Sequence, residues 1–510
     1  MITVKEYRGH IRNWKALTKE LSLAEDLTRE EREPLILAAA YAKWGEDLGN
    51  HIHGMFAAAL YDDTKDVTFL VRDPFGTKPM YYYVTEDGRL LFGTYIKSIL
   101  EAEGFVKELN LDMLQIYMSL TYVAGEDTFF KGVKKLMPGH TLSFKDGTFE
   151  IKRYFAPSFA PDETKTLEDW ADEIHSTLQS LMPEVAETDE HVESFLSGGV
   201  DSSYVLAMST ATDADSCGYD DERFDESGLA EETARILNKT FHRAKITPEM
   251  FFNEVPYVME HMEQPLGDAS AIVFSLGCKA TAENTKLVYS GEGSDEFFGG
   301  YNMYRNAERY GDNLKTFYVG NTNIMKEDEK KEILRSYNPD VLPINLVKDI
   351  YAENEGIDPL SKMSDVDIRI WLEGDIYLNV DKMSTACGLE VRMPLTDRRI
   401  FDIASRMPSR FKVTEEQNKV AFRTAAAKVL PEEIAFRKKL GFIVPIRIWM
   451  ADDRYNTDVR AKFASDTAAK FFDRDKIQAI FDAYVGGDSD LWRKVWTIYT
   501  FLVWYDIYFA

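Results

Sequence analysis

Short apolar runs separated by polar turns mark the first part of the chain. MFAAALYD (55–62) is one such run, and others flank the Asp-Gly pairs at 87–88 and 146–147. Apolar runs on both sides of Asp-Gly are typical of β-hairpins. We therefore expect residues 1–155 to form an antiparallel, β-rich domain, with a helix over PLILAAAYAKWG (34–45).

A polar stretch with two prolines, APSFAPDETKT (156–166), follows and is typical of a linker. Apolar side chains then recur at helical spacing, and short strands begin to alternate with helices. The expected strands are HVESFL (191–196), ADSCGY (214–219) and TKLVYS (285–290). This alternation indicates a parallel sheet. Residues 167–510 are therefore expected to form a second domain of the α/β class, with an almost wholly helical C-terminal part.

The charge of the chain narrows the choice of partners. It has 60 Lys+Arg against 86 Asp+Glu, a formal net charge of -26. Such a surface repels polyanions, so we expect neither nucleic acid nor an anionic membrane as a partner. The apolar tail YTFLVWYDIYFA (499–510) is too short for a membrane span and is broken by Asp506. We expect this tail to be a helix or strand packed on the core.

Cysteine usage indicates a reducing compartment. Cys217, Cys278 and Cys387 are far apart and form no C-x-x-C pair. Three widely spaced cysteines argue against a disulfide scaffold and against a structural zinc site. Residues 1–15 have no apolar signal-peptide core. We therefore expect a cytoplasmic protein.

Residues 195–203, FLSGGVDSS, place a glycine-rich turn where a strand should pass into a helix. Glycine lets the backbone approach a ligand, and the first N–H groups of a helix point outward with a partial positive charge. Together these features bind phosphate, and Ser197, Ser202 and Ser203 add hydroxyl donors. Asp201 can hold a Mg²⁺ that bridges phosphate oxygens. The simpler alternative is a helix N-cap with glycines in a tight turn.

A second acidic, glycine-rich loop follows another expected strand. LVYSGEGSDEFFGGY (287–301) carries Glu292 and Asp295. Parallel strands place their carboxyl ends at one edge of the sheet, where ligands of open α/β sheets bind. We therefore expect Asp201 and Asp295 to face one another across a metal-bound phosphate group, with Glu292 beside them.

These motifs, in this order, resemble the asparagine synthetase family of glutamine-dependent amidotransferases. The first part resembles the family's class II, Ntn-hydrolase-like glutamine amidotransferase domain through HGMFAAALYD (53–62), RDPFGTKPMYYY (72–83) and LMPGH (136–140). The second part resembles its PP-loop ATP pyrophosphatase domain through SGGVDSS (197–203), FDES (224–227), GDASAI (267–272), SGEGSDEFFGGY (290–301), VDKMSTACGLEVRMPLTD (380–397) and FRKKLGFIVPIRIWM (436–450). The resemblance implies a shortened amidotransferase-like domain at 1–155 and a synthetase domain at 167–510.

The resemblance also implies a reaction and a set of site residues. Such enzymes use ATP and Mg²⁺ to adenylate the side-chain carboxylate of aspartate, and ammonia then displaces AMP. ATP contacts are implied for Leu196, Ser197, Gly198, Gly199, Asp201, Ser202, Ser203, Ser290 and Gly291, and Mg²⁺ binding for Asp201 and Asp295. Glu292 would act on the acyl-adenylate and the incoming ammonia, and Lys439 would steady the transition-state charge. These roles are chemically reasonable. A carboxylate can take the proton from the ammonium that forms when ammonia attacks, and a lysine can neutralise charge on the phosphates.

The first domain departs from the family where glutamine would be hydrolysed. A glutamine-hydrolysing member begins with a cysteine after the initiator methionine, whereas residue 2 here is isoleucine and no cysteine precedes Cys217. The family's glutamine-binding Asn-Gly-Glu falls at RGH (8–10), and its amine-gripping aspartate is not evident near REP (32–34). The order of the motifs, compared with ordinary domain sizes, indicates that about 70 residues at the start of that domain are absent.

Two explanations of this departure stay open. Either the sequence is a fragment or has a wrong start, or the domain has lost glutaminase activity. Arg8 and His10 favour the second, because truncation would not alter surviving residues. With the loss, nitrogen would come from free ammonia, from a separate protein that supplies ammonia, or from an amine on the substrate.

Other functions compete with asparagine synthesis. Relatives without the cysteine close β-lactam rings or macrolactams on other carboxylates. In the β-lactam-forming relatives, a tyrosine stands at the position that corresponds to Glu292. The glutamate found here therefore favours an external nitrogen nucleophile. A regulatory or partner-binding pseudoenzyme is a second class, and the retained Asp201, Glu292, Asp295 and Lys439 argue against it. The acidic charge disfavours a tRNA-modifying enzyme. A homodimer remains open.

Overall fold

The computed structural model describes residues 1–186, 191–310, 317–438, 441 and 443–510. Two compact units are formed by interleaved segments of the chain. The first unit comprises Met1–Asn110, Gly125–Ser158 and Asp397–Phe401, and the second comprises Leu111–Ala124, Phe159–Thr396 and Asp402–Ala510. The domain boundaries at residues 155 and 166 stay a prediction.

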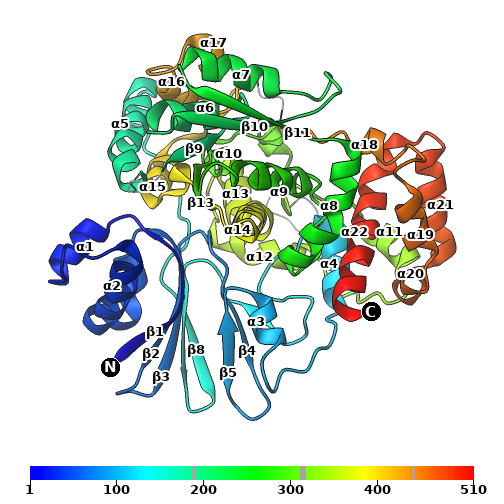
Figure 1. Cartoon of the computed structure of the whole chain (residues 1–510), viewed down its shortest axis with the longest axis horizontal. Helices are drawn as coiled ribbons and strands as arrows, with labels where there is room; N and C mark the ends of the chain where they lie inside the picture. Colours follow the sequence, from blue (N-terminus) through cyan, green and yellow to red (C-terminus); the bar gives the residue numbers. More distant parts are fainter. Residues whose placement is uncertain (187–190, 311–316, 439–440, 442) are drawn as a thin grey trace. The chain divides into compact units, whose positions relative to one another are not determined.

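Antiparallel sheets form the first unit, as the hairpin signals predicted. One sheet has the order β1-β2-β3-β7-β8, and Figure 1 draws β1, β2, β3 and β8 alongside one another. A smaller sheet has the order β5-β4-β6. The strands are β1 (Ile2–Ile11), β2 (Gly54–Asp62), β3 (Val67–Arg72), β4 (Tyr81–Val84), β5 (Leu90–Gly93), β6 (Lys134–Lys135), β7 (His140–Lys145) and β8 (Thr148–Arg153). The helices are α1 (Trp14–Glu20), α2 (Arg29–Trp44) and α3 (Ile96–Leu100).

β2 is buried on both faces, which explains its continuous apolar run. Phe56, Ala58 and Leu60 pack in the same cluster as residues of α2, whereas Ala57 and Ala59 pack with residues of the smaller sheet. Successive side chains of a strand point to opposite faces, so a strand covered on both sides needs apolar residues at every position.

The sheet of the second unit is parallel, as predicted, with the order β11-β10-β9-β12-β13. Its strands are β9 (Val192–Phe195), β10 (Asp213–Gly218), β11 (Thr240–Lys245), β12 (Leu287–Tyr289) and β13 (Glu390–Arg392). β9 lies at the centre, so its carboxyl end meets those of β10 and β12. The central strand is the one that leads into the glycine-rich turn.

Helices pack on this sheet and continue to the end of the chain (Figure 1). Up to the last strand they are α4 (Asp112–Leu120), α5 (Leu167–Val185), α6 (Val200–Met208), α7 (Ser227–Ile236), α8 (Pro248–Met262), α9 (Ser270–Thr281), α10 (Ser294–Phe298), α11 (Glu327–Ile333), α12 (Ile344–Glu353), α13 (Pro359–Val366), the π-helical η3 (Asp367–Ile376) and α14 (Tyr377–Ala386). Those after it are α15 (Arg398–Arg406), α16 (Val420–Ala426), α17 (Glu432–Ala435), α18 (Ile446–Trp449), α19 (Thr457–Ala464), α20 (Asp466–Phe471), α21 (Arg474–Val485) and α22 (Trp492–Phe509).

The apolar tail forms the C-terminal part of α22. The buried residues of this helix run from Val495 to Trp504. Within the described residues, no helix has the length and apolar character needed to cross a membrane.

Candidate functional site

The glycine-rich turn joins β9 to α6, and its geometry depends on the two glycines. Gly198 has φ 75°, and a Cβ there would lie 2.9 Å from the Leu229 Cβ. Gly199 is the N-cap of α6, so the first N–H groups of that helix are not covered by a capping side chain. The predicted phosphate cradle therefore has the expected local form, with backbone donors at a helix N-terminus.

The serines of the turn have different positions. Ser197 donates its backbone N–H to Ser202 Oγ at 3.1 Å, and both residues line a cavity. Ser203 is fully buried and donates its hydroxyl to the Gly199 carbonyl at 2.7 Å. Ser203 is not among the described residues that line the cavity, so its side chain stabilises the turn. Its contact with a nucleotide stays a prediction.

The second predicted loop packs directly on the first. It follows β12 and leads into α10, with Gly293 at φ 95°. A Cβ on Gly291 would lie 2.7 Å from the Ser202 backbone nitrogen. Only glycine allows the two loops to approach this closely. Two motifs that lie far apart in the sequence, at 195–203 and 287–301, therefore form one surface.

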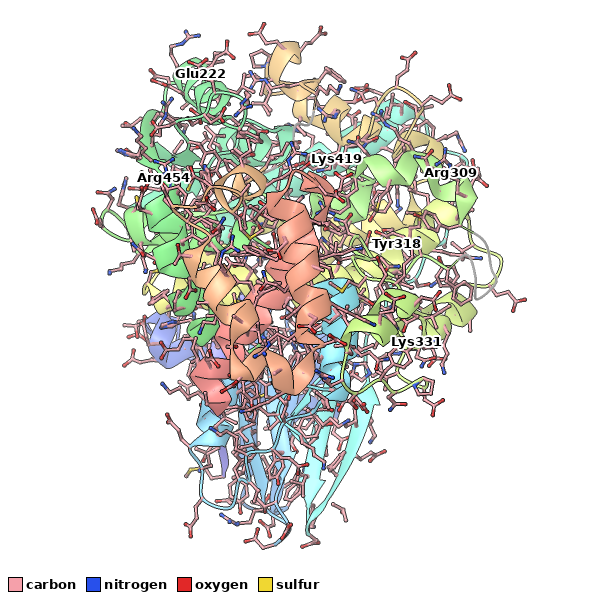
Figure 2. All side chains as sticks on the ribbon, turned by 90° about the vertical axis from the view of Figure 1, so that its right-hand side faces the viewer. Glu222, Arg309, Tyr318, Lys331, Lys419 and Arg454 are labelled. Atoms are coloured by element: carbon pink, nitrogen blue, oxygen red, sulfur yellow. The ribbon has the colours of Figure 1, made fainter. Side chains whose placement is uncertain are left out.

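Asp201 and Asp295 are brought together, and a residue that no sequence motif predicted lies between them. Lys419 Nζ is 2.7 Å from Asp201 Oδ1 and 2.6 Å from Asp295 Oδ1, and it donates to Ser294 Oγ at 2.8 Å. Lys419, labelled in Figure 2, has only 1% of its side chain exposed. One buried ammonium group therefore neutralises part of the negative charge of two carboxylates at this point of the site.

The donor set of Asp201 and Asp295 fits Mg²⁺. Mg²⁺ is commonly held by one or two carboxylates together with phosphate oxygens and water. Two carboxylates already share one cationic group here. Among the described residues, no three His, Cys, Asp or Glu side chains lie together as a metal site. The other ligands of a metal would therefore come from a bound phosphate and water.

Two arginines that sequence reasoning missed also belong to this region. Arg437 Nη1 donates to the Gly198 carbonyl at 3.0 Å, so it braces the turn. Burial lowers the pKa of Arg423, although the charges of Asp201 and Asp295 oppose this shift. Both arginines line the cavity. They add positive charge to a site that would receive phosphate.

One cavity of about 480 Å³ joins these elements. Of the predicted site residues, those that line it are Leu196, Ser197, Gly198, Gly199, Asp201, Ser202, Ser290, Gly291, Glu292 and Asp295. Lys438 and Gly441 line it too. The predicted catalytic Lys439 lies outside the described residues.

A buried carboxyl lies next to Asp295. Burial, followed by the charge of Asp295, raises the pKa of Glu296 to about 8, while the Tyr301 hydroxyl donates to it at 2.6 Å. Glu296 therefore favours its neutral form more strongly than an exposed glutamate does.

In the first unit, the RGH stretch lies within β1 and its side chains contact neighbouring residues. His10 Nδ1 lies 3.6 Å from Glu33 Oε1, and both side chains are buried. Glu33 also receives hydrogen bonds from the Tyr7 hydroxyl and the Ile11 N–H, each at 2.8 Å. Burial opposes ionisation of Glu33, but the neighbouring His10 side chain and the charge of Arg29 outweigh burial and lower its pKa.

Comparisons with known proteins agree with both parts of the chain. A family model described as asparagine synthase matches residues 173–506, and one described as a glutamine amidotransferase domain matches residues 3–155. Asparagine synthetase (glutamine-hydrolyzing) 1 of Bacillus subtilis is 32% identical over 98% of this chain and 85% of its own length. A putative asparagine synthetase (glutamine-hydrolyzing) of Mycobacterium tuberculosis is 29% identical over 98% of this chain and 84% of its own. The amidase chyE of Penicillium rubens is 29% identical over 53% of this chain and 43% of its own.

Proposed function

Because the chain belongs to the asparagine synthase family, we propose that it adenylates the side-chain carboxylate of aspartate with ATP and transfers free ammonia to it. Membership makes the protein a ligase that forms C–N bonds, in a family whose reaction is ATP-dependent amide formation. The observation that carries the proposal is Lys419 between Asp201 and Asp295, where the glycine-rich turn meets the second loop.

The phosphates of ATP would bind at the N-terminus of α6. Backbone N–H groups there, with the Ser197 and Ser202 hydroxyls, supply donors for anionic oxygens. Asp201 and Asp295 would hold Mg²⁺, which neutralises charge on the phosphates when bound. Lys419 would add a fixed positive charge beside the same phosphates, so charge that develops on the departing pyrophosphate is stabilised.

Glu292 would serve the second half-reaction. The aspartate carboxylate attacks the α-phosphorus of ATP, which yields the acyl-adenylate and pyrophosphate. Ammonia then attacks the acyl carbon, AMP leaves, and one proton must be removed from the new nitrogen. Glu292 lines the cavity beside Asp295 and can accept that proton. Lys439 remains the proposed second group that neutralises the transition state.

Ammonia is proposed as the nitrogen donor because of side chains within β1 and α2. His10 and Glu33 are paired with each other where the family resemblance predicts glutamine contacts. The Arg8 guanidinium lies 4.8 Å from the centre of the Tyr95 ring. A histidine and an arginine at these positions cannot offer glutamine the carboxylate and amide that the family's motif offers.

The first test is pyrophosphate release by the purified protein with Mg-ATP and aspartate, with ammonium or glutamine as nitrogen donor. We expect asparagine, AMP and pyrophosphate with ammonium, and no asparagine with glutamine. Turnover with glutamine would overturn the ammonia proposal. Absence of turnover with both donors would overturn aspartate as the acyl substrate.

A second experiment separates the two half-reactions. In Glu292→Gln, we expect asparagine formation to fall by about 100-fold or more, while aspartate-dependent exchange of labelled pyrophosphate into ATP continues. Glu222→Gln is the matched control, since Glu222 is exposed on the surface (Figure 2). Equal loss of exchange and amide formation in Glu292→Gln would contradict a role limited to ammonia transfer.

A further inference from the structure

The cavity extends beyond the phosphate cradle, along the face of the parallel sheet that α9 covers. At this end it is lined by Phe195, Asp215, Cys217, His242, Phe274 and Thr281. Phe195 is the last residue of β9, and Asp215 pairs with it in register on β10. The lining therefore comes from adjacent strands and from the helix above them.

The two ends of the cavity differ in chemistry. Lys419, Arg423 and Arg437 give one end positively charged groups suited to phosphate and to the reacting carboxylate. At the other end, the rings of Phe195 and Phe274 lie 5.3 Å apart at 65°. A nucleoside triphosphate whose phosphates bind at α6 would place its flat, apolar base against these rings, because that end offers aromatic walls.

A pair of buried carboxyls closes this aromatic end. Asp215 has 8% of its surface exposed and Glu193, on the neighbouring strand, has 1%. Asp215 Oδ2 and Glu193 Oε2 are both buried, and no described group outside this pair donates a hydrogen bond to either. The register of β9 and β10 places Glu193 beside Asp215, and two ionised carboxyls this close would repel each other strongly. Burial, then the hydrogen bond with Glu193, raises the pKa of Asp215 to about 8.

The sharing of one proton determines what Asp215 can offer a ligand. When one proton lies between the two carboxyls, the Asp215 carboxyl presents only acceptor lone pairs toward the cavity. Thr281 also contacts this carboxyl, and a carboxyl oxygen can accept more than one hydrogen bond. A base with an amino group at this position would be bound, whereas a base with a keto oxygen would place acceptor against acceptor.

We propose that Asp215, held in place by Glu193, selects the nucleobase by accepting a hydrogen bond from the 6-amino group of adenine and rejecting 6-oxo purines. The inference rests on the proposed function, because it assumes that the cavity binds a nucleoside triphosphate. Asp215 is then a specificity-determining residue and Glu193 a positioning residue.

Binding measured by calorimetry tests this selection on the full chain with Mg²⁺ and without aspartate or ammonium. The probes are ATP, inosine triphosphate and the triphosphate of unsubstituted purine riboside. We expect wild type to prefer ATP over inosine triphosphate by roughly 10- to 100-fold, with the unsubstituted purine between them. Asp215→Leu should reduce the ratio of ATP to inosine triphosphate affinity by about tenfold or more.

Two further variants keep the test decisive. Asp215→Asn should retain the preference, because its amide can donate to Glu193 and keep a carbonyl acceptor toward the base. Asp213→Asn is the matched control: Asp213 lies on the same strand but bonds to His242 at 3.0 Å and does not line the cavity. An unchanged ratio in Asp215→Leu, or loss of the preference in Asp215→Asn, would overturn the inference alone. Wild type that binds none of the three nucleotides would overturn the proposed function and this inference together.

Discussion

At the scale of single residues, Lys419 connects the two loops of the candidate site. Its ammonium group contacts two carboxylates that come from different loops, Asp201 after β9 and Asp295 after β12. Without this charge, two partly exposed carboxylates would face each other at an electrostatic cost. Lys419 therefore holds the two loops together, and under the proposed function it supplies the positive charge that a phosphate would meet.

Replacement of Lys419 by methionine tests this role. In Lys419→Met we expect the rate of ATP-dependent pyrophosphate release to fall by about 100-fold or more, because a preorganised charge beside the phosphates is lost. Lys428→Met is the matched control, since Lys428 forms ion pairs with the exposed Glu168 and Asp172. We expect the control to keep wild-type activity. A Lys419→Met protein that folds and keeps its activity would contradict the assignment.

The buried Asp367 predicts a dependence of stability on pH. It accepts hydrogen bonds from the hydroxyls of Tyr304 at 2.5 Å and Tyr318 at 2.9 Å, and burial raises its pKa to about 7. In the unfolded chain this pKa returns to about 4. The folded state therefore binds more protons between these two values, and Asp367 makes the protein less stable as the pH rises through this range.

Urea unfolding at pH 5 and pH 8 measures the effect. From pH 5 to pH 8, wild type should lose roughly 2 kcal/mol more of its free energy of unfolding than Asp367→Asn does. Other titrating groups are common to both proteins, so the difference isolates Asp367. Parallel pH profiles for the two proteins would show that Asp367 is ionised in the fold.

At the scale of elements, the contact between the two glycine-rich loops fixes the start of α6. A side chain at Gly291 would meet the backbone of Ser202 and Asp201 rather than a flexible side chain. We expect Gly291→Ala to weaken ATP binding by about tenfold or more, because the first turn of α6 must shift away from the phosphates. Calorimetric titration with Mg-ATP measures this change.

Gly228→Ala is the control for this substitution. Gly228 lies in α7, and a Cβ there meets no atom within 4 Å. Alanine should leave ATP binding unchanged and stabilise the helix by about 1 kcal/mol at most. If Gly291→Ala binds ATP as wild type does, the two loops are not held together as tightly as their contact indicates.

Local patterns predicted the elements well where one short stretch contains the whole signal. The Asp-Gly hairpins, the parallel strands and the turn after β9 all follow from neighbouring residues. The helix expected at 34–45 begins earlier, at Arg29, because Thr28 and Glu31 form a capping box. That signal is also local, and a search for S/T-x-x-E would have found it.

Local sequence patterns could not predict site residues whose position depends on tertiary contacts. Lys419 precedes α16 in the left-handed region, at φ 57° and ψ 40°, and nothing in the sequence around it marks a ligand site. The Asp215–Glu193 pair requires the register of two parallel strands. Both depend on which segments meet in space, which apolar periodicity alone does not determine.

At the scale of the whole molecule, the two compact units are built from interleaved segments. Residues 397–401 group with the first unit, far from the rest of that unit in sequence. Within this unit, Arg12 Nη1 donates to Asp397 Oδ2 at 2.9 Å, and both side chains are buried. The pair therefore fastens a late segment of the chain to the first strand.

Removal of this pair should destabilise the first unit. Burial opposes ionisation of Asp397, but the charges of Arg12 and Arg399 outweigh burial and hold its pKa well below the usual range. Asp397→Asn should lower the free energy of unfolding by about 3–5 kcal/mol at pH 7, because a buried charge loses its partner. A depressed pKa contributes stability above pH 4, so the difference from wild type should narrow as the pH falls below about 4.

Urea unfolding at pH 7 and at pH 3 measures both expectations. Arg410→Ala is the control, since Arg410 and its partner Glu163 are exposed and such pairs contribute little. A difference between Asp397→Asn and wild type that stays constant with pH would show that Asp397 is not held ionised by its arginines.

The interleaving also has a consequence for protein synthesis. The first strands of the N-terminal sheet leave the ribosome early, yet Arg12 cannot meet the Asp397 carboxylate until translation has passed residue 397. Most of the second unit has been made by then. Every strand of the N-terminal sheets precedes residue 154, so these sheets can form early, whereas the buried Arg12–Asp397 pair is completed only after the late segment has been made.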